Sequence, residues 1–210
     1  MVKVKICGIT NLKDARRAVE AGATFIGFNF YKRSPRYVTP GAAKRIMQRL
    51  PKRAKAVGVF VNETEEKMLT ISRQIGLSHL QLHGEESPEA VARLQKVLPI
   101  IKAIRVSESF SMSELARYQG VSAFLLDGFD RRLRGGSGKS FPWDVARRAK
   151  RAGCIFLAGG LTPANIGKAI RAARPYAVDV CSGVEAKPRK KDPVAVKDFM
   201  RAVHNAHKTI

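Results

Sequence analysis

Short runs of β-branched and other apolar residues alternate with amphipathic stretches along the whole chain. Such runs are typical of strands in a parallel sheet, and apolar residues three or four positions apart are typical of helices. The predicted strands are 3–7, 24–30, 55–61, 78–83, 99–106, 121–127, 154–158 and 176–181. The predicted helices are 11–22, 41–50, 64–76, 87–98, 111–119, 142–152, 163–173 and 193–207.

Unbroken repetition of strand and helix predicts parallel strands joined by right-handed crossovers. Eight such units in 210 residues predict an α/β protein with one domain, 1–210, folded as a (β/α)8 TIM barrel. A doubly wound open sheet is the alternative. No G-x-G-x-x-G sequence follows the first strand and the chain has no Walker motif, so the barrel is favoured.

Four predicted helices begin at a capping residue followed by proline, and proline is well suited to the first helical position. These pairs are Thr39-Pro40, Ser87-Pro88, Thr162-Pro163 and Asp192-Pro193. Two connections, 31–40 and 128–141, are longer than a simple turn requires. Because long loops that follow strands belong to the catalytic face of such a barrel, we expect a site there.

Side chains alternate along a strand, so parity predicts which residues face the barrel interior. If Cys7 faces inward, Lys3 and Lys5 do so too. The eighth strand places Asp179 and Cys181 on one face and closes onto the first strand. A buried charge needs a partner, which predicts a Lys5–Asp179 ion pair. The same parity turns further residues inward: Gln81, His83, Ala123, Leu125 and Asp127.

The chain is strongly basic, with 39 Lys and Arg against 17 Asp and Glu and a formal net charge of +22. This balance raises the possibility of nucleic-acid binding. The basic residues form short clusters on the polar faces of predicted helices and are not interleaved with aromatic residues. A solvated basic surface is therefore favoured, and its positive field would attract an anionic substrate.

Three cysteines, Cys7, Cys154 and Cys181, are spread along the chain without a C-x-x-C pair. Neither a disulfide framework nor a zinc site is indicated. No apolar run is long enough to cross a bilayer, and the N-terminus has no signal-peptide pattern. We therefore expect a cytoplasmic protein with three free thiols and no membrane partner.

Two glycine-rich turns, 157–162 and 181–185, follow the last two predicted strands. In a barrel of this kind, phosphate often binds at these two loops and a helix N-terminus. Glycine allows close approach to backbone N–H groups, although glycines also serve close packing alone. The paired turns predict phosphate binding at Gly159, Gly160, Ser182 and Gly183.

A series of motifs in order along the chain resembles one known family. The motifs are Lys5-Ile6-Cys7-Gly8-Ile9-Thr10, 27–31, 34–38, Gln81-Leu82-His83-Gly84, Leu126-Asp127, 135–141, 157–161 and 178–185. Together they resemble the phosphoribosylanthranilate isomerase family of tryptophan biosynthesis, whose fold is a barrel of the ribulose-phosphate-binding type. The resemblance runs from residue 3 to about residue 192 and so covers nearly the whole chain.

The resemblance implies an Amadori rearrangement of N-(5-phosphoribosyl)anthranilate to 1-(2-carboxyphenylamino)-1-deoxyribulose 5-phosphate, without metal or cofactor. An acid protonates the ring oxygen and opens the sugar to a Schiff base, and a base then removes the C2′ proton. The match assigns the acid to Asp127 and the base to Cys7. Burial or negative charge should keep Asp127 protonated, and Lys5 or helix N-termini should favour the Cys7 thiolate. Taken alone, Cys7 would be a small buried apolar residue and Asp127 a turn former.

Further binding roles follow from the same match. Arg36 is expected to clamp the anthranilate carboxylate with its planar guanidinium. His83 either lines the substrate pocket or ties the fourth strand to a neighbouring loop. The stretch 131–140, rich in glycine, resembles a lid that would carry Lys139 to the substrate.

The sequence departs from the family pattern at two places and leaves rival functions open. Cys181 stands where serine is expected, which places a second sulfur near Cys7, and 186–192 replaces the usual Pro-Gly turn. One rival is another phosphate-binding aldose–ketose isomerase, of the histidine-pathway type, with paired aspartates in place of Cys7 and Asp127. The other is a basic barrel that binds nucleic acid without catalysis. The chain is expected to be a monomer or a homodimer.

Overall fold

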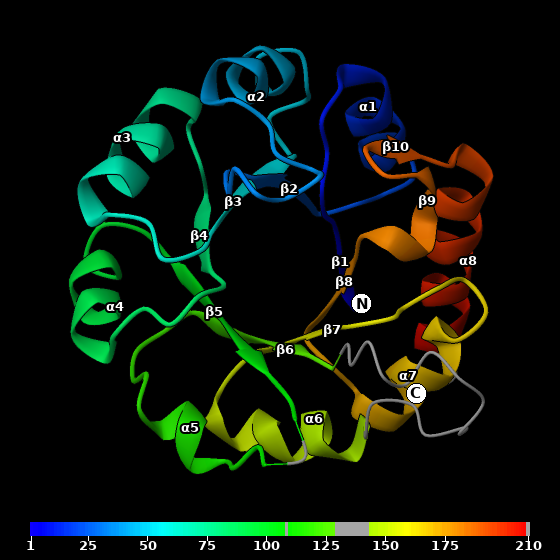
Figure 1. Cartoon of the computed structure of the whole chain (residues 1–210). Coiled ribbons are helices and arrows are strands. Elements are labelled where there is room, and N and C mark those ends of the chain that lie inside the picture. Colours follow the sequence, from blue (N-terminus) through cyan, green and yellow to red (C-terminus); the bar gives the residue numbers. More distant parts are fainter. Residues whose placement is uncertain (108, 129–142, 209–210) are drawn as a thin grey trace.

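The computed structural model describes residues 1–107, 109–128 and 143–208, with side chains described to residue 206. Eight parallel strands close into a barrel in the order β1 to β8, and a ring of helices surrounds it (Figure 1). The strands are β1 (Lys3–Ile6), β2 (Phe25–Asn29), β3 (Lys55–Phe60), β4 (His79–Leu82), β5 (Ile100–Arg105), β6 (Ala123–Asp127), β7 (Ile155–Ala158) and β8 (Ala177–Val180). The helices are α1 (Leu12–Glu20), α2 (Pro40–Met47), α3 (Glu65–Ile75), α4 (Pro88–Leu94), α5 (Ser113–Ala116), α6 (Trp143–Ala149), α7 (Ile166–Ala173) and α8 (Pro193–Lys208).

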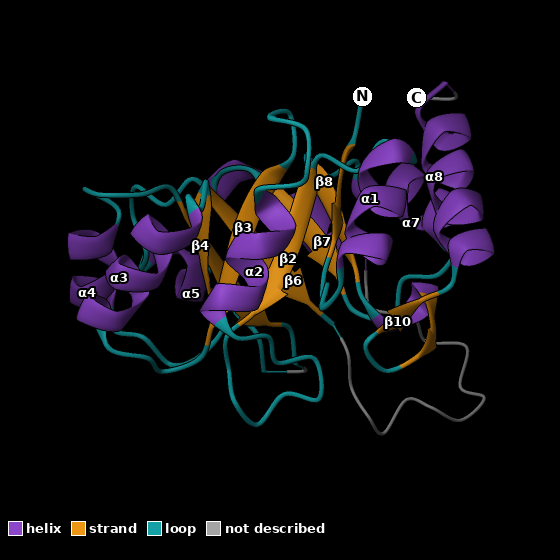
Figure 2. Ribbon diagram, turned by 90° about the horizontal axis from the view of Figure 1, so that it is seen from above, coloured by secondary structure: helices purple, strands orange, loops and turns teal. Residues whose placement is uncertain are grey.

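Closure of the barrel depends on the pairing of β8 with β1, in which Lys5 lies opposite Asp179 and Ile6 opposite Val180. This pairing confirms the predicted TIM barrel, and the open-sheet alternative was wrong. All eight strands end at the same mouth of the barrel, so the loops that follow them gather on one face (Figure 2). No helix among the described residues is long and apolar enough to span a membrane.

Apolar side chains form two layers, as alternation along the strands requires. One layer packs between strands and helices, with Ile26, Phe28 and Leu80 among its fully buried members. The other fills the barrel interior and consists of Phe25, Val57, Ile101, Ala103, Ala123, Leu125, Phe156, Ala158 and Ala177. The inner layer gives the polar mouth a packed floor, and it confirms that Ala123 and Leu125 face inward.

Capping residues set most helix starts. Thr39 and Ser87 accept hydrogen bonds from backbone N–H groups in the first turns of α2 and α4, and Asp192 does so before α8. The predicted start at Pro163 was wrong, because α7 begins only at Ile166. The Asn165 side chain is engaged in the preceding turn instead, where it accepts from the Thr162 N–H at 2.8 Å and donates to the Gly160 carbonyl at 2.9 Å.

Other departures from the predicted elements concern loops and short helices. The helix predicted over 111–119 is only Ser113–Ala116, and α6 passes into the 3-10 helix η2 (Lys150–Ala152). After β8 the chain forms the 3-10 helix η3 (Ser182–Val184) and then an antiparallel hairpin of β9 (Glu185–Lys187) and β10 (Lys190–Lys191). The alternation of apolar residues did not predict this hairpin, whose strands are short and charged.

Candidate active site

Cys7 lies immediately after β1, buried at the mouth of the barrel with 9% of its surface exposed. Its N–H donates to the Val180 carbonyl of β8 at 2.9 Å, which continues the parallel pairing by one residue. Gly27 of β2 makes room for the thiol, because a Cβ at that position would lie 2.9 Å from the Cys7 sulfur. The thiol is therefore held between β2 and β8.

Beneath Cys7, the Lys5 ammonium lies 3.0 Å from a carboxylate oxygen of Asp179 and is fully buried. The ion pair predicted from parity is confirmed. Burial raises the pKa of Asp179 to about 6, because it disfavours the carboxylate more than Lys5 stabilises it. Burial alone would lower the pKa of Lys5, but Asp179 and Cys7 outweigh it and the pKa is raised. Lys5 therefore stays charged next to the thiol.

The second sulfur predicted near Cys7 is present, because the pairing of β1 with β8 places Cys181 beside Cys7. Interaction with the Cys181 thiol, together with the charge of Lys5, holds the pKa of Cys7 well below its usual range despite burial. Interaction with Cys7 and burial raise the pKa of Cys181. Cys7 therefore carries the thiolate of the pair.

A second group of charges lies around Cys181 and connects it to the loop after β2. Arg36 donates to Glu185 through Nε at 2.9 Å and through Nη2 at 2.6 Å. Lys191, which is 2% exposed, donates to the same carboxylate at 3.0 Å and to the Cys181 carbonyl at 2.9 Å. Burial alone would raise the pKa of Glu185, but hydrogen bonds from these two cations lower it.

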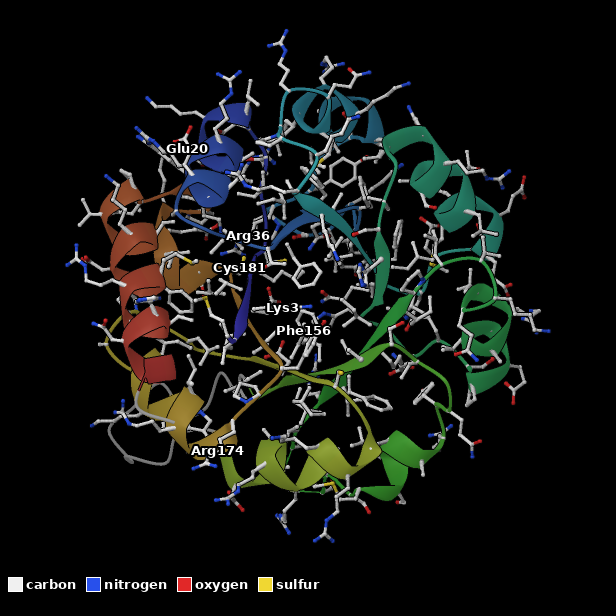
Figure 3. The ribbon with its side chains drawn as sticks, turned by 180° about the vertical axis from the view of Figure 1, so that it is seen from behind. Lys3, Glu20, Arg36, Phe156, Arg174 and Cys181 are labelled. Carbon is white, nitrogen blue, oxygen red and sulfur yellow. The ribbon has the colours of Figure 1, made fainter. Side chains whose placement is uncertain are left out.

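Glu185 and Lys191 received no role from the sequence. Lys191 follows Lys190 in a basic run that is typical of a solvated surface, and only the hairpin turns it inward. Arg36 and Cys181 both border Gly8, where a Cβ would lie 2.6 Å from Arg36 Cδ and 2.9 Å from the Cys181 sulfur. Figure 3 shows these two labelled residues close together near the barrel centre, whereas Glu20 of α1 and Arg174, which follows α7, lie on the outside.

Across the mouth, β4 and β6 contribute His83 and Asp127. His83 Nε2 lies 3.5 Å from Asp127 Oδ2, and about a third of each side chain is exposed, 33% and 30% respectively. Gln81 Nε2 lies 2.9 Å from His83 Nδ1. Because an amide nitrogen only donates, Nδ1 accepts and the neutral ring carries its proton on Nε2, facing the carboxylate. The predicted inward direction of Gln81 and His83 agrees with this contact.

The two glycine turns after β7 and β8 lie against each other. A Cβ on Gly183 would lie 1.8 Å from the Leu161 carbonyl oxygen, so only glycine fits there. Gly159 and Gly160 have φ of 87° and 61°, in the left-handed region that favours glycine. Ser182 begins η3 beside this contact. The four residues predicted to bind phosphate thus belong to two adjoining turns, the first of which precedes α7.

Two remaining expectations concern ligands. Lys139 and the stretch 131–140, which were expected to cover the substrate, lie outside the described residues. Within the described ranges, no three His, Cys, Asp or Glu side chains are grouped to hold a metal ion.

Cys7 follows β1 and Asp127 ends β6, but both lie at one mouth, and the Asp127 charge is close enough to raise the pKa of Asp179. A thiolate, a carboxyl group and a pair of glycine turns there define a (β/α)8-barrel enzyme equipped for acid–base chemistry.

Comparison with known proteins narrows this class to one family. The model of the N-(5'-phosphoribosyl)anthranilate (PRA) isomerase family matches residues 4–202. The N-(5'-phosphoribosyl)anthranilate isomerase of Trichlorobacter lovleyi is 48% identical over 98% of this chain and 100% of its own length. The chain belongs to the phosphoribosylanthranilate isomerase family.

Solved structures agree with this assignment. The phosphoribosyl anthranilate isomerase of Thermotoga maritima superposes with a TM-score of 0.91 at 44% identity, over 98% of this chain and 100% of that one. A structure of the isomerase in complex with reduced 1-(o-carboxyphenylamino)-1-deoxyribulose 5-phosphate has a TM-score of 0.88 at 42% identity, with the same coverage.

Proposed function

We propose that this protein catalyses the Amadori rearrangement of N-(5-phosphoribosyl)anthranilate in tryptophan biosynthesis, in the cytoplasm, with Cys7 as base and Asp127 as acid. The observation that carries the proposal is the meeting of a buried thiol after β1 and a carboxylate at the end of β6 in one mouth. Full-length membership of the isomerase family supports the same reaction.

Asp127 would donate its proton to the furanose ring oxygen, opening the ring to a Schiff base. Its partial exposure leaves room for a substrate oxygen to approach. As the carboxylate forms, the Nε2–H of His83 faces it and stabilises the negative charge. This interaction grows as the proton leaves, so it favours the transition state over the ground state.

Cys7 would then remove the C2′ proton, with the electron pair moving toward the iminium nitrogen to give an enolamine. A thiol can act only as the thiolate, and the neighbouring Cys181 thiol and the charge of Lys5 support that form. Tautomerisation of the enolamine to the ketone completes the rearrangement and requires no redox partner.

Binding of the substrate would use both ends of the mouth. The turns that contain Gly159, Gly160, Ser182 and Gly183 supply backbone N–H groups for the phosphate. Arg36 would receive the anthranilate carboxylate, with its Nε and Nη2 held by Glu185 so that the guanidinium keeps one orientation. Lys139 is proposed as a further substrate contact.

The test is turnover of N-(5-phosphoribosyl)anthranilate by the purified protein and by its Cys7→Ala and Asp127→Asn variants. A positioned acid or base contributes about 10²- to 10⁴-fold, so each variant should lose that much in kcat while the circular dichroism spectrum stays unchanged. Complementation of a tryptophan-requiring strain that lacks the isomerase should fail with the same variants. Undiminished turnover in both variants would refute the assignment of acid and base.

A further inference from the structure

We infer that Lys191 determines the preference of the site for a substrate that bears a carboxylate, because it balances the charge of Glu185 and leaves Arg36 able to bind a second carboxylate. This inference rests on the proposed function, in which Arg36 receives the anthranilate carboxylate. It gives a role to a buried lysine that the proposed acid–base steps do not use.

The guanidinium of Arg36 has two edges that can each hold a carboxylate. Its Nε and Nη2 donate to Glu185 at 2.9 and 2.6 Å, so one edge is occupied. Among the residues that the structure describes, none accepts a hydrogen bond from Nη1. The edge formed by Nη1 and Nη2 is therefore the one for the substrate, and 22% of the Arg36 side chain is exposed.

A substrate carboxylate on that edge would place two negative charges on one guanidinium, and their repulsion would weaken binding. Lys191 removes this penalty. Its Nζ lies 3.0 Å from Glu185 Oε1, and only 2% and 3% of the two side chains are exposed. Water and salt screen such a buried pair only weakly. In the complex, two cations thus face two carboxylates.

Lys191 is held at this point by the antiparallel hairpin of β9 and β10, on the face where the loops after the strands gather (Figure 2). The register of the hairpin shifts between Lys190 and Lys191, and such an irregularity redirects a side chain. Lys190 is exposed, whereas Lys191 is buried and donates through Nζ to the Cys181 carbonyl at 2.9 Å. Asp14, the other carboxylate beside Lys191, is bonded by its backbone N–H at 2.8 Å. The ammonium is therefore directed to Glu185.

The same hairpin fixes the loop that carries Arg36. Arg189 Nη1 donates to the carbonyls of Pro35 and Tyr37 at 3.3 and 3.1 Å. These two residues flank Arg36, so the loop is bonded to the hairpin on both sides of it. The ion pairs at Arg36 therefore do not depend on flexible side chains alone, and the site is organised before the ligand binds.

The experiment compares two ligands that differ only in the carboxylate. One is reduced 1-(o-carboxyphenylamino)-1-deoxyribulose 5-phosphate, and the other is the same compound with an unsubstituted phenyl ring. Titration calorimetry gives both dissociation constants, and their ratio measures the preference for the carboxylate. The variants are Lys191→Met, Glu185→Gln and the two combined. The exposed neighbour provides the matched control, Lys190→Met.

Lys191→Met should lower the preference about 10-fold, through weaker binding of the carboxyphenyl compound alone. Glu185→Gln removes the competing negative charge and should raise the preference. The combined variant should lie within about 3-fold of the wild type, because the two changes cancel in charge. Lys190→Met should match the wild type. In Lys191→Met the KM for N-(5-phosphoribosyl)anthranilate should rise about 10-fold while kcat changes little.

Equal loss of affinity for both compounds in Lys191→Met would show a purely structural role and would overturn the inference. If Lys191→Met does not fold, Glu185→Gln decides, and a preference that does not rise in that variant overturns the inference. A wild type that binds both compounds equally, or neither, would do the same.

Binding of these compounds does not require turnover. A wild type that shows the preference but does not isomerise N-(5-phosphoribosyl)anthranilate would therefore contradict the proposed acid–base chemistry alone. The affinities of the variants would still decide the role of Lys191.

Discussion

The two sides of the barrel mouth hold their polar groups very differently. On the β1–β8 side, the side chains of two separate ion pairs, Lys5–Asp179 and Lys191–Glu185, are almost completely buried. On the β4–β6 side, His83 and Asp127 are about one third exposed and 3.5 Å apart. One side is fixed by the protein, and the other is open to water.

This difference matches the chemistry proposed for each side. A thiol must be ionised before the substrate arrives, so its surroundings have to supply positive charge and a hydrogen-bond donor in advance. An acid must regain its proton after each turnover, which requires access to water. The free energy of unfolding should therefore be sensitive to changes beside Cys7 and insensitive to changes beside Asp127.

The largest effect on the free energy of unfolding is expected from Lys5→Met. This change leaves the buried carboxylate of Asp179 without its cation, which typically costs about 3–5 kcal/mol in the free energy of unfolding. It also removes the positive charge next to Cys7, so alkylation of Cys7 at pH 7 should slow. Urea unfolding and alkylation with iodoacetamide measure the two effects.

Lys102→Met is the matched control for that change. Lys102 is 1% exposed and pairs with Glu86 at 2.9 Å on the outer side of the barrel wall. Its loss should destabilise the protein comparably while leaving Cys7 alkylation unchanged. Equal alkylation rates in the two variants would show that Lys5 does not act on the thiol.

The second-largest effect on stability is expected in the two glycine turns that follow β7 and β8. Gly183→Ala forces a methyl group to within 1.8 Å of the Leu161 carbonyl, so one of the two turns must move. Such overpacking costs about 1–3 kcal/mol of stability. Displacement of the N–H groups should also raise the KM for the phosphorylated substrate about 10-fold or more. Thermal unfolding and steady-state kinetics test both.

Gly167 in α7 provides the control for Gly183→Ala. At Gly167 a new Cβ would meet only the flexible Arg171 side chain, at 3.5 Å. Gly167→Ala should be neutral or stabilise the helix by up to about 1 kcal/mol, with KM unchanged. A rise in KM in this variant too would mean that helix α7 as a whole, rather than the contact between the turns, determines binding.

Much of the fixed side follows from the sequence, because strand parity is a strict constraint. Alternation placed Lys5, Asp179 and Cys181 on one inner face, and closure of the barrel brought β8 to β1. The inward direction of Gln81 and His83 follows in the same way. Residues at strand ends are predictable because a one-residue slip would expose an entire apolar face.

The positions of the charged residues around Cys181 could not be predicted, because strand parity does not apply to the hairpin that carries them. Lys191 and Glu185 are brought inward by a hairpin of charged residues that has no apolar alternation. The late start of α7 has a similar origin, since the Asn165 side chain bonds to the Thr162 N–H and the Gly160 carbonyl, and the helix that Thr162 was expected to cap begins only at Ile166. Loop conformation depends on particular hydrogen bonds, which periodicity does not encode.

The third effect is a pH dependence of stability that separates the two sides. The pKa of Asp179 is about 6 in the folded protein, against about 3.9 for aspartate in an unfolded chain. Between these values the folded state holds a proton that the unfolded state has released. The contribution of Asp179 to the free energy of unfolding should therefore fall by about 2 kcal/mol as the pH rises from 4 to 6.

Urea unfolding of the wild type and of Asp179→Asn across that range isolates the contribution. The difference in free energy of unfolding between the two proteins should decline toward pH 6 and stay level above pH 7. A difference that does not change with pH would show that Asp179 keeps an ordinary pKa, and the contrast between the two sides would lose its electrostatic basis.

The smallest effect is expected on the open side, from His83→Ala. A partly exposed pair at 3.5 Å typically contributes up to about 1 kcal/mol, so stability should change little. Because His83 meets the carboxylate only weakly before the proton leaves, kcat/KM should fall less than about 10-fold. His83→Gln, which keeps an N–H donor, should lose still less. A loss in kcat as large as that of Asp127→Asn would instead make His83 part of the proton transfer. The acid would then be a coupled pair, held as firmly by the protein as the thiol on the opposite side.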